Sequence, residues 1–437
     1  FSSAELEHTH ADEFAHAVQI GNAIEEKRLL DAVLRARDAV GGPLYSAMTD
    51  CGAGGFSSAI GEMAKDLGAE VHLDRAPLKY DGLTYTEIWI SEAQERLVLA
   101  VPEHHLASLQ EICDQEGVEV ADLGHFGTAD RTLDLFFHGT QVGQLTMEFL
   151  HDGLPMPTRK ATWHAPVVRG SLPAAASASL ARPVSDSLRT LLAHPDIASK
   201  HWIVRQYDHE VQGNTIVKPL VGPGGNGPGD ASVLEPVPGA GPGVALACGL
   251  TTGLGDPALG GDPYHMAIAA IDECVRNLVC VGGDPSRTAI LDNFCWPSCD
   301  KPEHMGALVR ACEGCYDGAM AYRTPFVSGK DSLNNQFRYD DPAGGGKRLI
   351  EIPYTLLISG LARVRNVSRC VTMDAKQPGN LLVLIGTTDA RMGGSHFQRL
   401  FARGTRAVSD DTTWHIPTVD LRTGPAAARA VHSAIEA

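Results

Sequence analysis

Short apolar segments typical of β-strands alternate with amphipathic segments typical of helices in the first 155 residues. Asn22 caps a predicted helix, with Glu25 at the capping-box position and apolar residues recurring behind it at helical spacing. A strand at 44–48, a helix at 57–67 and strands at 86–90, 97–101 and 132–137 follow. This alternation across short turns predicts an α+β or α/β domain over 1–155.

The alternation resumes after a stretch rich in Pro, Ala, Ser and Arg, which we interpret as a linker over 156–184. A second domain is predicted over 185–372, with helices at 264–281 and 305–320 and strands at 289–291 and 325–327. The apolar run 381–385, followed by Gly386, predicts a buried strand. It belongs to a third unit over 373–437.

Composition excludes several classes of protein. The 437 residues are 43% hydrophobic, which is enough for buried cores. No apolar run reaches the length of about 18 residues that a membrane-spanning helix needs. A formal net charge of −17 argues against broad electrostatic binding of nucleic acid. Ten cysteines without a secretory signal indicate reduced thiols in a cytoplasm.

Four cysteines have a spacing that can hold zinc, namely Cys295, Cys299, Cys312 and Cys315. Alternatively, Cys312 and Cys315 are ordinary buried thiols on one face of a predicted helix over 303–322. The spacing leaves both interpretations open, and we favour the buried thiols.

Glycine is concentrated in residues 221–261, where 13 of 41 residues are Gly without a strict period. One interpretation is a flexible surface loop. The other is a backbone that approaches phosphate groups closely, which side chains would prevent. The polar residues Asn226 and Asp230 slightly favour the second interpretation.

Asp50 follows the predicted strand at 44–48 by two residues and precedes a glycine-rich turn and a helix N-terminus. In this arrangement a carboxylate holds a magnesium ion while backbone N–H groups face a phosphate. A purely structural turn explains the same pattern equally well.

A second polar group, residues 91–96, lies between two predicted strands. Strand alternation would send Glu92 and Gln94 to one face, and Ala93 and Glu95 to the other. Glu92 and Gln94 could then grip the amide or hydroxyl groups of a substrate, although a solvated strand end is the favoured alternative.

A third polar group comprises Asp292 and Asn293 after one predicted strand and residues 328–332 after another. Lys330 offers a point charge to phosphate, Gly329 a close backbone approach, and Asp292 a cation ligand. No glycine stands five residues before Gly329, so this is not a Walker motif. A fourth polar group, residues 207–212, contains His209, which is more often structural than catalytic in such a setting.

The two ends of the chain resemble each other, because residues 18–20 and 419–421 each precede a turn and a predicted helix. The second copy stops before a glycine-rich loop of its own could follow. We therefore expect the sequence to be a piece of a longer protein.

The polar groups named above occur in the order, and with the residues, of one known family. Residues 49–55, 91–96, 207–212, 291–296 and 328–332 resemble phosphoribosylformylglycinamidine synthase, the synthetase subunit of purine biosynthesis. The resemblance implies an α+β aminoimidazole-ribonucleotide-synthase-like fold, tandemly duplicated in the family. By this resemblance residues 1–155 are a first C-terminal-type domain, 185–372 a second ATPase-like domain, and 373–437 the start of a second C-terminal-type domain.

The family joins formylglycinamide ribonucleotide, ATP and glutamine-derived ammonia into the amidine, with release of ADP and phosphate. The resemblance implies Mg²⁺, a cytoplasmic location, and a glutaminase subunit and a small bridging subunit as partners. It also implies site residues: substrate contacts at Gln19, Glu92, Ala93, Gln94 and Ser332, nucleotide contacts at Asp292, Gly329 and Lys330, and a magnesium ligand at Asp50.

The sequence departs from the family at two of these positions. Ala93 replaces the Ser of many relatives, and Lys330 replaces a magnesium-binding Asn of some. The family's catalytic histidine lies in a first ATPase-like domain that the resemblance does not include, so we expect the chain alone to be inactive. The alternatives are a non-catalytic nucleotide-binding piece and another synthase of the same fold, such as aminoimidazole ribonucleotide synthase.

Overall fold

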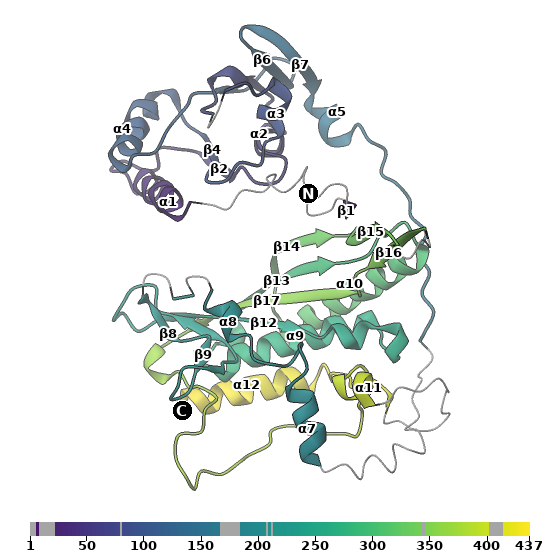
Figure 1. Cartoon of the computed structure of the whole chain (residues 1–437). Helices are drawn as coiled ribbons and strands as arrows, with labels where there is room; N and C mark the ends of the chain where they lie inside the picture. Colours follow the sequence, from purple (N-terminus) through teal and green to yellow (C-terminus); the bar gives the residue numbers. More distant parts are fainter. Residues whose placement is uncertain are drawn as a thin grey trace. The chain divides into compact units, whose positions relative to one another are not determined.

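The computed structural model describes residues 6–7, 22–78, 81–166, 184–206, 209–210, 213–341, 346–401 and 414–437. The chain divides into two compact units, one made chiefly of residues 7–158 and the other chiefly of residues 159–437 (Figure 1). Within the described residues, no helix is both long enough and apolar enough to cross a membrane.

The first unit combines two small sheets with helices. β5, β3, β6 and β7 form one sheet, in which β3 and β6 are parallel, and β2 and β4 form an antiparallel pair. The elements are α1 (Ala23–Arg37), β2 (Ala47–Asp50), α2 (Phe56–Met63), β3 (Ala69–His72), α3 (Tyr85–Ile90), β4 (Leu97–Ala100), α4 (Leu106–Glu116), β5 (Gly124–Phe126), β6 (Thr132–Phe137), β7 (Thr140–Thr146) and α5 (Met147–Asp152).

Helix α1 begins where the sequence predicts, and its buried residues are Ala32, Val33 and Ala36. The side chain of Asn22 accepts the Ile24 N–H at 3.1 Å, as an N-cap does. The Asn22 N–H donates to Glu95 rather than to Glu25, so the predicted capping box does not form. α1 packs against α4 through Ala32 and Ala36, whereas Ile24 is 64% exposed.

The predicted strand at 86–90 is wrong, because these residues form helix α3. The Thr84 side chain accepts the Glu87 N–H at 3.3 Å, and the Glu87 carboxylate accepts the Thr84 N–H at 2.7 Å. This reciprocal capping box satisfies the first N–H groups of the helix. It outweighs the β-propensity of the residues that follow, and Ile88 is buried against the core.

The second unit is built on a six-stranded sheet in the order β14-β13-β17-β12-β11-β8. β13 and β14 are parallel, and the other neighbours are antiparallel. The elements are β1 (Leu6–Glu7), α7 (Val184–Leu192), α8 (His201–Val204), β8 (Thr215–Val217), β9 (Leu220–Val221), β10 (Gly227–Pro228), β11 (Ser232–Leu234), β12 (Gly243–Leu250), α9 (Pro263–Cys280), β13 (Thr288–Cys295), α10 (Pro302–Tyr322), β14 (Phe326–Ser332), β15 (Gln336–Asp340), β16 (Lys347–Glu351), β17 (Thr355–Val364), α11 (His396–Phe401) and α12 (Thr423–Glu436).

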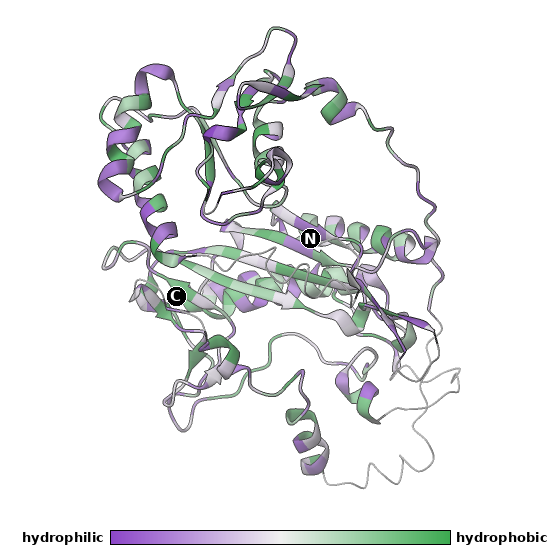
Figure 2. Ribbon diagram, turned by 45° about the horizontal axis from the view of Figure 1, so that its top comes forward, coloured by the Kyte–Doolittle hydropathy of each residue, from purple (hydrophilic) through white to green (hydrophobic). Residues whose placement is uncertain are grey.

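Helix α9 forms the centre of this unit and contacts β12, β17, α10 and α12. The side chains of Leu356 and Ile358 in β17 are fully buried, and Leu361 on the opposite face is 49% exposed. The sheet therefore has a covered face and an open face, and Figure 2 shows hydrophobic colour on both strands and helices. A Cβ added to Gly360 would stand 2.5 Å from the Cys274 sulfur, so this glycine lets α9 lie close to the sheet.

One further prediction for the second unit, and the less favoured of two interpretations of its glycine-rich stretch, need correction. Residues 381–385 form no strand, and their exposed fractions run from 56% for Ile385 to 103% for Leu382. A strand requires a partner for its backbone groups, and this segment pairs with none of the described strands. The glycine-rich residues 221–261 contain β10, β11 and β12 and are therefore not simply a flexible loop.

Candidate functional site

The first candidate site is a glycine turn between β2 and α2, as the sequence predicts. Asp50 is the exposed last residue of β2, which ends two residues beyond the predicted strand at 44–48. Its Oδ2 accepts the Gly52 N–H at 3.2 Å. Glu92 Oε1 accepts the Gly54 N–H at 3.2 Å from the other side. Two carboxylates thus hold one glycine turn.

Close packing explains why the turn is glycine-rich. Gly55 has φ 59° and ψ −138°, a backbone conformation that side chains disfavour. A Cβ at this position would stand 2.2 Å from the carbonyl oxygen of Ser91. At Gly52 a Cβ would stand 2.7 Å from Asp50 Oδ2. The turn therefore fits directly against residues 91–96.

Residues 91–96 do not form the end of a strand, which corrects the predicted alternation of their side chains. They connect helix α3 to β4, so the two-residue period of a strand does not apply. Gln94 Nε2 donates to the Glu92 carbonyl oxygen at 3.2 Å, which folds the segment on itself. Glu92, Ala93 and Gln94 are all half-buried.

Arg96 positions this segment, a role that the sequence analysis missed. Its Nε donates to the Ala93 carbonyl oxygen at 3.0 Å, and its guanidinium also donates to the Ser91 carbonyl oxygen. The same guanidinium lies 4.6 Å from the centre of the Phe56 ring, at the start of α2. An arginine placed directly after a polar run and before an apolar strand was the available signal.

The donor set of the first site suits a hard cation. An exposed carboxylate stands at a strand end beside backbone N–H groups and the N-terminus of α2, and Mg²⁺ prefers oxygen ligands with room for water. A cavity of about 1510 Å³ in the same unit is lined by Ser91, Ala93 and Gln94 together with residues of α1, β2 and β4. Asp50 and Glu92 do not line this cavity.

The second candidate site lies on the two parallel strands β13 and β14. Asp292 pairs with Gly329, and Asn293 pairs with Lys330. A Cβ at Gly329 would stand 2.5 Å from Asp292 Oδ1, so the glycine makes room for that carboxylate. Burial raises the pKa of Asp292, and the nearby charge of Asp331 raises it further.

Asp292 and residues 328–332 lie within these strands and not after them, because β13 continues to Cys295 and β14 to Ser332. β14 is the last strand of the sheet, so the polar residues lie along its edge. Lys330 is exposed there. Ser332 is only 5% exposed, and its carbonyl oxygen accepts the Trp296 N–H at 2.8 Å.

The structure describes only part of the remaining predicted site residues. Gln19 lies outside the described residues, as do four residues of the polar group 207–212. His209 Nε2 lies 3.7 Å from Glu210, and Glu210 forms an ion pair with Lys218 at 2.9 Å. His209 thus lies beside an ion pair, and its structural interpretation stays a prediction.

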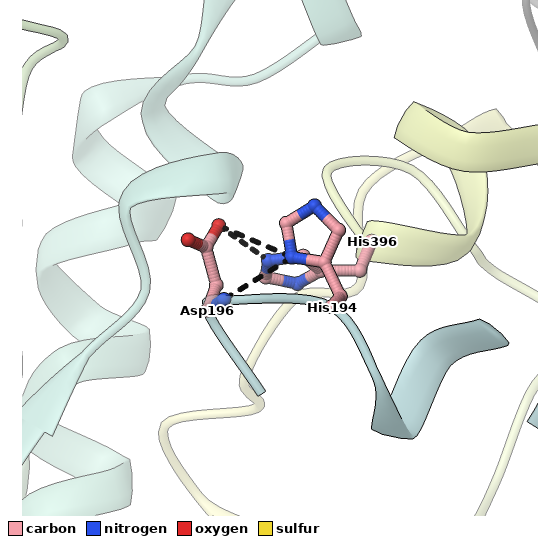
Figure 3. Close-up of side chains that lie close together, drawn as sticks. All are labelled: His194, Asp196 and His396. Atoms are coloured by element: carbon pink, nitrogen blue, oxygen red, sulfur yellow. Dashed lines mark hydrogen bonds and ion pairs between the residues drawn. The ribbon is translucent and has the colours of Figure 1, made fainter. Parts of the chain in front are cut away.

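The four cysteines do not form a zinc site. Within the described residues, the one group of three or more metal-binding side chains with atoms close together is His194, Asp196 and His396 (Figure 3). Cys315 is buried, and burial raises the pKa of its thiol. Cys312 is exposed, which corrects the prediction that both thiols of this helix are buried.

Comparison with known proteins agrees with this architecture. The C-terminal domain model of AIR synthase related proteins matches residues 1–133, and the N-terminal domain model matches residues 229–346. The phosphoribosylformylglycinamidine synthase subunit PurL of Thermococcus sibiricus is 32% identical over 405 residues, which are 92% of this chain and 51% of the relative. The PurL of Anaeromyxobacter is 33% identical over 451 residues, covering 99% of this chain and 53% of the relative.

Solved structures show the same fold. Thermotoga maritima PurL complexed with FGAR has a TM-score of 0.58 and 22% identity, covering 83% of this chain and 54% of that one. The structure of PurLQS from the same organism has a TM-score of 0.60 and 22% identity, covering 85% and 54%. The chain spans about half the length of the curated relatives it matches. The chain therefore belongs to the AIR synthase related family, in which it is similar to the phosphoribosylformylglycinamidine synthase subunits.

Proposed function

We propose that this chain serves the ATP-dependent synthesis of formylglycinamidine ribonucleotide from formylglycinamide ribonucleotide and ammonia. The observation that carries the proposal is the glycine turn held by Asp50 and Glu92, in a sequence similar to PurL over nine-tenths of its length. Because the chain spans about half of those relatives, the complete reaction is proposed for the whole protein.

The first site is proposed to hold Mg²⁺ and substrate. Asp50 is the metal ligand, because its carboxylate is exposed and already oriented by the Gly52 N–H. Bound Mg²⁺ would neutralise phosphate charge. Glu92, Ala93 and Gln94 are the substrate contacts, with Ala93 contributing its backbone, and Gln19 is a further one.

The second site is proposed to contact ATP through Asp292, Gly329 and Lys330. Lys330 is exposed on the edge strand, where its ammonium group can meet a phosphate as a point charge. Gly329 is proposed to contact the nucleotide through its backbone, beside the Asp292 carboxylate for which it makes room. Ser332 is proposed as a substrate contact, and since its side chain is buried, the contact requires a local movement.

The proposed chemistry is required because the oxygen of an amide is a poor leaving group. ATP transfers its γ-phosphoryl group to the amide oxygen, with ADP leaving, and ammonia then attacks the amide carbon so that phosphate departs with the oxygen. The proposed tasks of the protein are orientation of the reactants and neutralisation of negative charge. The net charge of −17 cannot supply this, so local cationic groups must do so.

The remaining parts of the proposal concern organisation. We assign residues 1–155 to a C-terminal-type domain, 156–184 to a linker, 185–372 to an ATPase-like domain, and 373–437 to the start of a second C-terminal-type domain. Ammonia would come from a glutaminase subunit, joined through a small bridging subunit, in a cytoplasmic complex.

Calorimetry on the 437-residue chain tests the two sites separately. We expect Mg-ATP binding that weakens in Lys330→Ala but not in the control Lys160→Ala, which removes an exposed lysine of the same unit. We expect formylglycinamide ribonucleotide to bind in a Mg²⁺-dependent way, with a higher Mg²⁺ requirement in Asp50→Asn and an unchanged one in Asp66→Asn. Absence of both binding events would refute the proposal.

An activity assay separates the proposed enzyme from its alternatives. With ammonia supplied, we expect no amidine from the chain alone, since the family's catalytic histidine is not among its matched residues. Measurable turnover by the chain alone would contradict this expectation. Binding of aminoimidazole ribonucleotide precursors in preference to formylglycinamide ribonucleotide would favour another synthase of the fold.

A further inference from the structure

His194, Asp196 and His396, none of which belongs to the two candidate sites, converge in the second unit (Figure 3). His194 and Asp196 follow helix α7, and His396 begins helix α11 about 200 residues later. His396 Nε2 lies 2.9 Å from Asp196 Oδ2, and His194 Nδ1 lies 3.8 Å from the same oxygen. Both rings thus direct a nitrogen at one carboxylate oxygen.

Local structure holds each half of this triad independently. The His194 N–H donates to the Leu191 carbonyl oxygen at 3.0 Å, and the Ile197 N–H donates to that of His194 at 2.9 Å. Pro195 stands between the two ligands and restricts the backbone. On the other side, the Gln398 N–H donates to Ser395 Oγ at 3.2 Å, beside His396. The three side chains are therefore presented by ordered turns.

The donor set is that of a first-row divalent metal such as zinc. Two imidazole nitrogens and a carboxylate oxygen are common zinc ligands, and metal–ligand distances near 2.0–2.2 Å place neighbouring donors roughly 3–3.5 Å apart. The donor atoms all lie within 4.8 Å of one another, and the two separations given above bracket the required value. Small side-chain rotations would bring the three donor atoms to the separations that one bound ion requires.

The surroundings permit entry of an ion and leave a further position for water. The side chains of His194 and His396 are 26% and 33% exposed, and that of Asp196 is 55% exposed. The hydrogen bond with His396 lowers the pKa of Asp196, the positive charge of Arg399 lowers it further, and the Arg399 guanidinium also lies 3.9 Å from Asp256. His194 Nδ1 accepts the Asp196 N–H at 3.2 Å, so its lone pair is engaged in this hydrogen bond, which an incoming ion has to replace.

We propose that His194, Asp196 and His396 bind one zinc-type divalent ion, which ties helix α11 to the turn after α7. The site is structural, shares no residue with the proposed Asp50 and Asp292 sites, and does not depend on the proposed function. The competing explanation is a hydrogen-bonded triad without an ion.

Zinc chloride titrated into the chelator-treated full chain tests the proposal by calorimetry, with excess Mg²⁺ present to occupy oxygen-only sites. We expect one equivalent to bind, with affinity reduced roughly 100-fold or more in His396→Ala and in His194→Ala. The control His201→Ala, an exposed histidine of the same segment, keeps wild-type affinity.

Asp196→Asn separates the two explanations, because an amide oxygen can still accept a hydrogen bond from His396 but is a far poorer zinc ligand. We expect this variant to fold normally and to lose at least about tenfold in zinc affinity. Hydrogen exchange of residues 391–401 should slow on zinc addition in the wild type alone. Zinc binding that is unchanged in Asp196→Asn and His396→Ala, or no stoichiometric binding at all, would overturn the proposal.

Discussion

Gly55→Ala should destabilise the first site more than a Gly→Ala substitution at any other position of the glycine turn. Gly55 holds φ 59°, and an added Cβ would stand 2.2 Å from the Ser91 carbonyl oxygen and 3.0 Å from the Ile90 carbonyl carbon. The left-handed backbone costs about 1–2 kcal/mol for a residue with a side chain. Forcing the turn away from residues 91–96 adds roughly 1–3 kcal/mol, as overpacking does. We expect a local loss of about 2–5 kcal/mol.

Gly139→Ala is the matched control, because Gly139 has φ +76° with open space around the added Cβ. It lies in the turn between β6 and β7 of the same unit, so it should show the backbone cost alone. Native-state hydrogen exchange of peptides covering α2 and 91–96 measures the local opening free energy. If Gly55→Ala costs no more than Gly139→Ala, the close packing of the turn against Ser91 is refuted.

Three further predictions concern the second unit and the metal. Leu356→Ala, at a fully buried position of β17, should lower the free energy of unfolding of this unit by about 2–5 kcal/mol. Leu361→Ala, on the open face, should change it by no more than about 0.5 kcal/mol. Hydrogen exchange of β17 and α9 measures both effects. Asp292→Asn should raise stability at neutral pH, because the folded-state pKa of Asp292 is raised and its ionised form is disfavoured. The gain in stability of Asp292→Asn over the wild type is complete above the raised pKa and disappears as the pH falls below the ordinary carboxyl pKa. Denaturation curves in which the stability difference between the two proteins does not change with pH would contradict this prediction. Asp50→Asn should leave stability nearly unchanged, since the amide oxygen still accepts the Gly52 N–H, and should raise the Mg²⁺ concentration needed for substrate binding roughly tenfold or more.

Local rules explain the parts of the fold that could be predicted. Helices α9 and α10 and strand β6 lie where their periodicity places them, because a long amphipathic period leaves few alternatives. The Asn22 cap and the Asp50 turn depend on residues close in sequence and are also confirmed. Helix α3 was missed although its capping-box signal, Thr84 with Glu87, was present in the sequence.

Contacts between distant residues account for what could not be predicted. Arg96 contacts Ser91 and Phe56 only when α3 and β4 pack beside the glycine turn. The hydrogen bond from Gly54 to Glu92 depends on the same packing. Residues 381–385 have the composition of a buried strand, but burial depends on a partner that composition cannot supply.

The sequence by itself determined the α+β class and the order of the polar motifs, because caps, periods and glycine turns act over a few residues, whereas the roles of the site residues follow from the family resemblance and stay predictions. The tertiary structure decided which of those residues meet. It set Asp292 opposite Gly329 and brought His194 and His396 to one carboxylate across 200 residues. Such meetings depend on sheet register and helix packing, which are properties of the whole unit.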